Sequence, residues 1–157
     1  MKKLNLIATV LTTFTLASSA LAATSATLQL RGVVPARLSI ELIDDTAAGT
    51  LDLETTQTDL LVAQTREKSN SKTGYKVNIS STNNGELVSD EDSSSTIAYT
   101  LKYDGSAVDL SGEDFSYAYP TPGNNDRDVQ ISYTGVAFED LVEGTYGDDV
   151  TFVISAN

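Results

Sequence analysis

The chain has 157 residues, carries a formal net charge of −12 at pH 7, and contains neither cysteine nor histidine. Without cysteine no disulfide can stabilise the fold, and without either residue the Ser-His and Cys-His pairs of nucleophilic enzymes are excluded. The acidic balance argues against nucleic acid and anionic membrane surfaces as partners, because both bind basic patches.

The first 22 residues have the pattern of an export signal. A basic start at residues 1–3 precedes an apolar run over residues 4–21, which is diluted with threonine and serine. The run ends in Ala20-Leu21-Ala22, the small-x-small pattern at which signal peptides are cleaved. A single membrane anchor, the alternative, needs a longer and more continuous apolar run. We therefore expect a signal peptide at residues 1–22 and an exported mature chain that begins at Ala23.

The next segment, residues 26–34, alternates as an extended strand does. Its sequence, ATLQLRGVV, places Leu28, Leu30, Gly32 and Val34 on one face at a period of two residues. Gly32 is unusual in such a face, since glycine packs nothing and weakens a strand. Its presence is explained if another backbone must approach closely at that point. We expect this strand to pair either within its own sheet or with a neighbouring molecule.

After Pro35, which interrupts strand pairing and marks a bend or an edge position, short alternating segments recur along the chain. Asp104-Gly105 is a hairpin turn signal, and one helical turn is expected at residues 139–141. Residues 60–63 alone also fit a helical turn. The expected loops are residues 66–74, 81–95 and 115–128. The expected strands are residues 37–43, 51–53, 59–65, 75–80, 97–103, 107–110, 129–133 and 150–156.

This pattern predicts an all-β protein with a single domain over residues 35–157. Roughly seven or eight short strands with turn residues between them, and no convincing helix beyond the signal peptide, are typical of a sandwich or barrel. Because the strands are short and the connections uneven, we favour an immunoglobulin-like β-sandwich.

The charged residues form no catalytic or metal-binding pattern. Acidic runs such as residues 90–92 are typical of solvated loops rather than of a carboxylate pair at glycosidase spacing. Residues 124–128 look faintly like a calcium loop but lack the glycine and glutamate of an EF-hand. We therefore expect no enzyme activity, no metal and no cofactor. Tyr117 and Tyr119, in the loop rich in proline and glycine, are a candidate contact with a glycan or a protein.

The C-terminal residues repeat the alternation of the first strand. Val150, Phe152 and Ile154 follow one another at a period of two, and Gly144 precedes them. An alternating strand at a sheet edge can receive a partner strand, with an apolar pocket at every second residue. The alternative is an ordinary closed sandwich whose first and last strands pair within one molecule.

The two ends together resemble a known family. Residues 27–34, including Gly32, look like the donor-strand extension of chaperone–usher pilus subunits. Gly144 followed by Val150, Phe152 and Ile154 is similar to the C-terminal pattern of these subunits. The resemblance implies an immunoglobulin-like sandwich that lacks its last strand. A periplasmic chaperone lends a strand to the gap, and the extension of the next subunit then replaces it.

Carried over to this sequence, the resemblance implies a role for each end. Residues 23–34 would be the N-terminal extension, with Leu28, Leu30, Gly32 and Val34 as its donor-strand residues. The acceptor and chaperone edge would comprise Gly144, Val150, Phe152, Ile154 and Asn157, whose carboxylate would anchor the chaperone. The implied partners are copies of this chain or related subunits, the chaperone, an outer-membrane usher and a host glycan or protein. The implied location is a fimbria on the cell surface, with a role in adhesion.

The sequence departs from parts of the family pattern. Ala156 stands where many such subunits have tyrosine, and the absence of cysteine excludes the disulfide of type 1-like subunits. Disulfide-free groups fit better: the alpha-class fimbriae, or the spore-coat-U-like subunits, which share a Gly-Thr-Tyr segment like residues 144–146. The alternative function is that of a self-contained secreted or periplasmic β-sandwich that binds a glycan or protein through its loops.

Overall fold

A computed structural model describes residues 25–110, the backbone of residues 115–119, and residues 123–157. The expected signal peptide therefore lies outside the described residues. The chain divides into two compact units, Met1–Val33 and Val34–Asn157. In the first unit, residues 25–33 form neither helix nor strand, and the side chains of Leu28 and Leu30 are 81% and 85% exposed.

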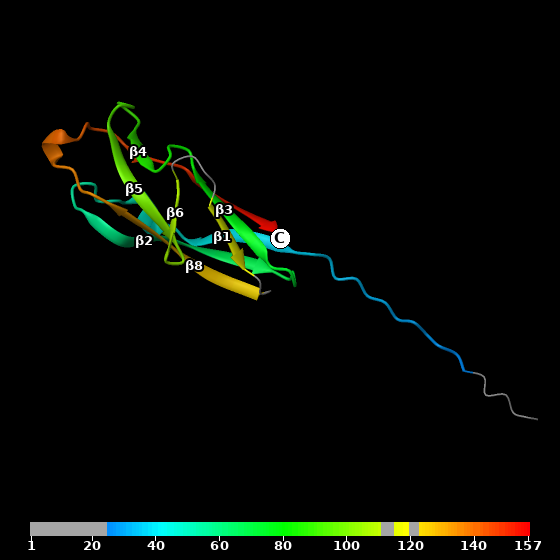
Figure 1. The fold of residues 1–157 in the computed structure, drawn as a ribbon. Coiled ribbons are helices and arrows are strands. Elements are labelled where there is room, and N and C mark those ends of the chain that lie inside the picture. The colour runs from blue at the N-terminus through cyan, green and yellow to red at the C-terminus, as the bar shows by residue number, and fades with distance from the viewer. Residues whose placement is uncertain (1–24, 111–114, 120–122) are drawn as a thin grey trace, which may run out of the picture. The chain divides into compact units, whose positions relative to one another are not determined.

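The second unit is an all-β sandwich, as the sequence predicts (Figure 1). Every ladder between its described strands is antiparallel. Two short 3₁₀ turns, η1 (Thr46–Gly49) and η2 (Phe138–Asp140), lie in its connections. The strands are β1 (Leu38–Asp44), β2 (Gln57–Ser69), β3 (Tyr75–Ser81), β4 (Glu86–Ser89), β5 (Thr96–Tyr103), β6 (Ser106–Val108), β7 (Phe115–Tyr119), β8 (Gly123–Tyr133), β9 (Tyr146–Gly147) and β10 (Val150–Ala156).

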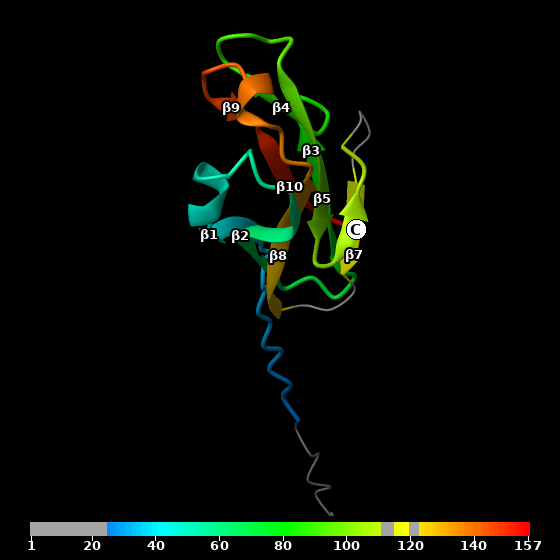
Figure 2. The same cartoon turned by 90° about the vertical axis from the view of Figure 1, so that its left-hand side faces the viewer.

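The strands form two sheets. The larger has the order β1-β2-β8-β5-β4-β9, with β6 beside β5, and the smaller has the order β10-β3-β7 (Figure 2). Alternate residues of each strand point between the sheets, because side chains in a strand alternate at a period of two. On β3 this places Tyr75, Val77 and Ile79 inward, and all three are 0% exposed. They pack with buried residues of β2, β5 and β8 in a single core.

A buried glutamate joins four strands at one end of the core, close to the turn between β2 and β3. Glu67 of β2 is 0% exposed and accepts hydrogen bonds from the hydroxyls of Tyr75, at 2.9 Å, and Tyr103. The guanidinium Nε of Arg127 lies 3.4 Å from the same carboxylate. Burial and the bond to Glu67 raise the pKa of Tyr75 to about 12 and also raise the pKa of Tyr103. Both hydroxyls therefore stay protonated and able to donate.

Most predicted strands are confirmed, with corrections where long strands replace expected loops. β2 continues to Ser69 and β8 begins at Gly123, so parts of the expected loops over residues 66–74 and 115–128 are strand. The polar residues there alternate between the buried and solvent faces of a paired ribbon, in which Arg66 binds Asp126 with two bonds of 2.7 and 2.8 Å. β4, within residues 81–95, was not predicted, and the strand expected at residues 51–53 is wrong.

Candidate functional site: an open edge between the two sheets

The sandwich has two unpaired strand edges that lie close together. Among the described strands, β1 pairs only with β2, and β10 pairs only with β3. β1 and β10 approach until some of their Cα atoms lie within 8 Å, but no ladder joins them. Each edge thus leaves backbone N–H and C=O groups without a strand partner, which makes it a template for pairing with another chain. We call the region between β1 and β10 the edge groove.

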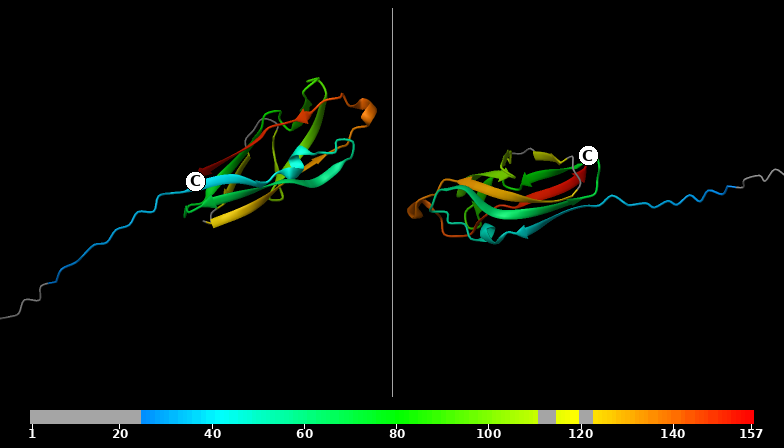
Figure 3. Two further views of the ribbon diagram at one scale, coloured as in Figure 1. Left: turned by 180° about the vertical axis from the view of Figure 1, so that it is seen from behind. Right: turned by 90° about the horizontal axis from the view of Figure 1, so that it is seen from below.

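The strands that border the edge groove run in opposite directions. Leu38 at the start of β1 pairs with Ser69, and Ala156 at the end of β10 pairs with Tyr75. Ser69 and Tyr75 flank the same β2–β3 turn, so the start of β1 and the C-terminus lie at one end of the sandwich. Figure 3 shows this arrangement from two sides. A strand placed in the groove therefore runs antiparallel to one neighbour and parallel to the other.

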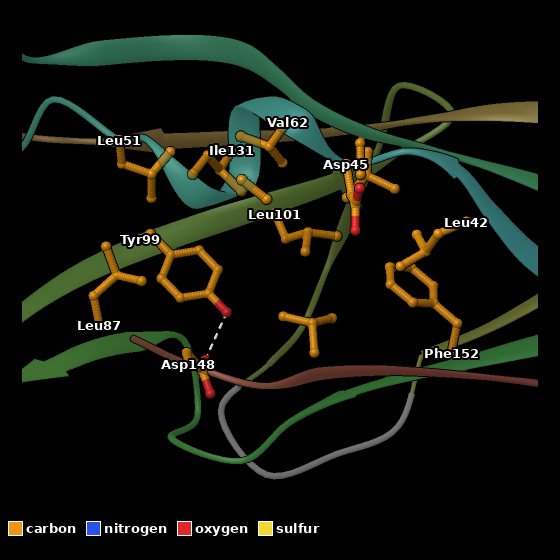
Figure 4. A pocket seen from close by; sticks show the side chains of 14 residues that line it. Leu42, Asp45, Leu51, Val62, Leu87, Tyr99, Leu101, Ile131, Asp148 and Phe152 are labelled. Carbon is orange, nitrogen blue, oxygen red and sulfur yellow. Dashed lines mark hydrogen bonds between the residues drawn. The ribbon is translucent and has the colours of Figure 1, made fainter. Parts of the chain in front are cut away.

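An apolar cavity of about 210 Å³ opens beside these edges (Figure 4). Leu42 of β1 and Phe152 of β10 lie close together on one side of it, and Tyr99 donates a hydrogen bond of 2.6 Å to Asp148 on the other. Burial and Asp148 raise the pKa of Tyr99, so its hydroxyl remains a donor. The other lining residues are Asp45, Ala48, Leu51, Val62, Ala63, Leu87, Leu101, Val129, Ile131 and Val150.

The cavity marks a place where the core is incompletely filled. Protein interiors are normally packed as densely as organic crystals, with few voids larger than a water molecule. This cavity of about 210 Å³ is open on one side, so its apolar lining is left in contact with solvent. Leu42 of β1, which lines the cavity, also remains 53% exposed. Apolar side chains from another segment would therefore be stabilised by entering the groove.

No protein-family model matches the sequence, and no curated protein matches it significantly. The part of the chain that the structure describes contains no helix long and apolar enough to cross a membrane. Its acidic residues form no group of three or more suited to a metal ion. The site must therefore be interpreted from its own geometry, which is that of an apolar groove between two strand edges.

Three of the sequence-predicted acceptor residues face the groove. Val150, Phe152 and Ile154 are half-buried and pack against the core, whereas Thr151 and Val153 between them are exposed. The ring of Phe152 lies 5.7 Å from that of Tyr103, which connects this edge to the buried glutamate. The β10 edge thus has its apolar side chains at alternate positions, on the face that packs against the core.

Two other predicted edge residues lie outside the groove. Gly144 precedes β9 and packs against the β4–β5 connection, where an added Cβ would come within 2.8 Å of the Asp90 carboxylate. The neighbouring Thr145 is held there by a hydrogen bond of 2.7 Å from its backbone N–H to Asp90. Asn157 follows β10, and its side chain donates a bond of 3.0 Å to the carbonyl of Thr73.

The expected ligand loop is a strand. Tyr117 and Tyr119 belong to β7, where their backbones pair with Val77 and Tyr75 of β3. The sequence FSYAY alternates aromatic with small residues, which suits a strand, but the prolines and glycine after it favoured a loop. The assignment of these tyrosines to a loop is therefore corrected.

The four residues predicted to form a donor strand precede β1 in the sequence. Leu28, Leu30 and Val34 are each more than four-fifths exposed. A Cβ added at Gly32 would meet no atom within 4 Å. Nothing in the described fold therefore accounts for a glycine at position 32 or for apolar residues around it.

The β1 side of the groove was missed by sequence reasoning. The alternation of Leu38, Ile40 and Leu42 was recognised as a strand, but its place at a sheet edge beside β10 was not. Pro35 marks a bend or an edge position, but the local sequence does not say which other strand lies beside that edge.

Proposed function

We propose that this protein is a structural subunit of a bacterial surface fibre, in which residues 26–34 of one copy insert into the edge groove of the next. The observation that carries the proposal is the pair of unpaired edges, β1 and β10, beside an unfilled apolar cavity. An inserted strand supplies backbone partners to the β10 edge and apolar side chains to the cavity.

The segment and the groove match in length and pattern. Nine extended residues span about 30 Å, enough to cover the seven residues of β10, which span about 23 Å. Leu28, Leu30 and Val34 would point toward the core at the same period as Phe152 and Ile154. Because all described ladders are antiparallel, we place the inserted strand antiparallel to β10.

The proposal also accounts for the exposed leucines of the segment. Leu28 and Leu30 together present an apolar face that soluble proteins normally cover. Insertion into a second copy buries this face and the open groove at once. The resemblance to chaperone–usher subunits adds a periplasmic chaperone that covers the groove before assembly, an usher that exports the subunits, and a role in adhesion at the cell surface.

Binding of a synthetic peptide with the sequence of residues 25–34 tests the proposal. With a sandwich that begins at Pro35, we expect saturable binding that Gly32→Leu weakens about fivefold or more, because overpacking costs about 1–3 kcal/mol. The matched control is Arg31→Leu, which adds an apolar side chain on the opposite face of the strand and should bind about as well as the unchanged peptide. Equal binding by the Gly32→Leu peptide, or no binding by any peptide, would contradict the proposal.

A further inference from the structure

A single asparagine holds the backbone that leads into β1. The side-chain Oδ1 of Asn70 accepts a hydrogen bond of 2.7 Å from the backbone N–H of Arg37, and its Nδ2 donates a bond of 2.9 Å to the carbonyl of Pro35. The backbone N–H of Asn70 also donates to the carbonyl of Arg37 at 3.3 Å. We call these three bonds the Asn70 clamp.

The clamp extends the β1–β2 ladder beyond its last regular pair. Leu38 pairs with Ser69, so Arg37 and Asn70 are the next two residues opposite each other. Only an asparagine side chain at this reach offers both an acceptor and a donor; aspartate keeps the acceptor alone. The two side-chain bonds therefore depend on the identity of residue 70, whereas the backbone bond does not.

Two features of the sequence stiffen the same stretch. The ring of Pro35 fixes its own φ angle, and a proline restricts the preceding residue, Val34, to extended conformations. Between Val34 and the first residue of β1 only Pro35, Ala36 and Arg37 intervene. A linker of three residues, of which Pro35 and Arg37 are held by the clamp and Pro35 is also fixed by its ring, has little conformational freedom.

We propose that the Asn70 clamp makes residues 35–37 a rigid joint, which fixes the direction in which each subunit is attached to the strand that it donates. This inference rests on the proposed function, because the joint follows the segment that inserts into the next copy. Asn70 is thus a positioning residue. It takes no part in the edge groove but sets the angle between successive subunits and so the stiffness of the fibre.

Backbone dynamics of the mature full-length chain test the joint before any fibre forms. By ¹⁵N relaxation, the amides of Ala36 and Arg37 should be as ordered as those of β1, and Asn70→Ala should make both mobile. The matched control is Asn83→Ala, which removes a comparable side-chain bond of 3.1 Å, to the carbonyl of Gly147 at the other end of the sandwich. It should leave Ala36 and Arg37 ordered. Unchanged order at these amides in Asn70→Ala would overturn the inference.

Electron microscopy of fibres then measures the consequence. Fibres of Asn70→Ala should form but bend more readily, with a persistence length shortened about twofold or more, while Asn83→Ala fibres keep the original stiffness. Asn70→Asp, which keeps only the acceptor, should give fibres of intermediate stiffness. Equal stiffness of Asn70→Ala and unchanged fibres would refute the proposal that residues 35–37 form a rigid joint.

Failure of the peptide to bind the groove would instead refute the proposed function. The amide dynamics would then still show whether residues 35–37 are rigid.

Discussion

Removal of residues 23–34 from the chain is expected to abolish the polymer formation that the proposed strand exchange predicts. The truncated protein keeps the sandwich but has no strand to donate, and its own edge groove remains open. Exposed apolar surface beside unpaired strand edges favours non-specific association, so the truncated chain should aggregate readily. Analytical ultracentrifugation and negative-stain microscopy would compare it with the complete mature chain.

Addition of the missing strand as a peptide provides the control. At a peptide concentration of 100 times its Kd, binding stabilises the folded state by about 2.7 kcal/mol, which corresponds to a rise in Tm of roughly 10 °C for a domain of this size. The peptide should also suppress aggregation without forming polymers, because it carries no sandwich. A truncated chain that is a soluble, cooperatively folding monomer and ignores the peptide would show that the sandwich is complete in itself.

Glu67→Ala is expected to cause the largest loss of stability among single substitutions of charged residues. The carboxylate is fully buried and accepts bonds from Tyr75 and Tyr103, while Arg127 lies beside it. Its removal leaves two buried hydroxyls and a largely buried guanidinium without this acceptor. Loss of one partner from a buried ion pair typically costs about 3–5 kcal/mol, and chemical denaturation would measure it.

The matched control is Glu41→Ala on β1. Glu41 also lies in a strand and forms an ion pair, with the ammonium of Lys68 at 2.5 Å, but both side chains are nearly half exposed. Exposed ion pairs contribute little, so this variant should unfold at almost the same denaturant concentration as the unchanged protein. If the two substitutions destabilised the protein equally, burial of Glu67 would not be the cause.

Local patterns predicted the parts of the fold that depend on local chemistry. β3 was predicted from the alternation of Tyr75, Val77 and Ile79, which reflects one buried face. The turn at Asp104 was predicted from Asp-Gly, and both residues adopt positive φ angles, of 50° and 76°. β10 was predicted with its bounds intact, from Val150 to Ala156.

Long strands with polar sequences could not be predicted in the same way. The second half of β2 and the first half of β8 contain polar or charged residues at almost every position. They are strands because they pair with each other, as Arg66 does with Asp126, and not because either sequence favours a strand. Glu67 is buried in this region for the same reason, since only the tertiary arrangement supplies its hydroxyl partners.

The candidate site was half predictable. The strands β10 and β1 could both be predicted, because their apolar residues alternate at a period of two. Their assembly into one groove depends on which strands occupy the sheet edges, and that is a property of topology rather than of either sequence. The cavity beside Leu42 and Phe152 likewise requires residues from both sheets.

The most direct test of strand exchange uses the absence of cysteine from the chain. Arg31→Cys introduces one thiol on the outward face of the proposed donor strand, and Val153→Cys introduces one on the outward face of β10. Thr151→Cys and Ser155→Cys test the two neighbouring registers of the same pairing. Mature chains carrying one substitution each are refolded together and oxidised. We predict a disulfide-linked dimer that requires one chain of each kind. The account would be contradicted if the mixture gave no such dimer and one chain with both substitutions closed an internal disulfide as a monomer.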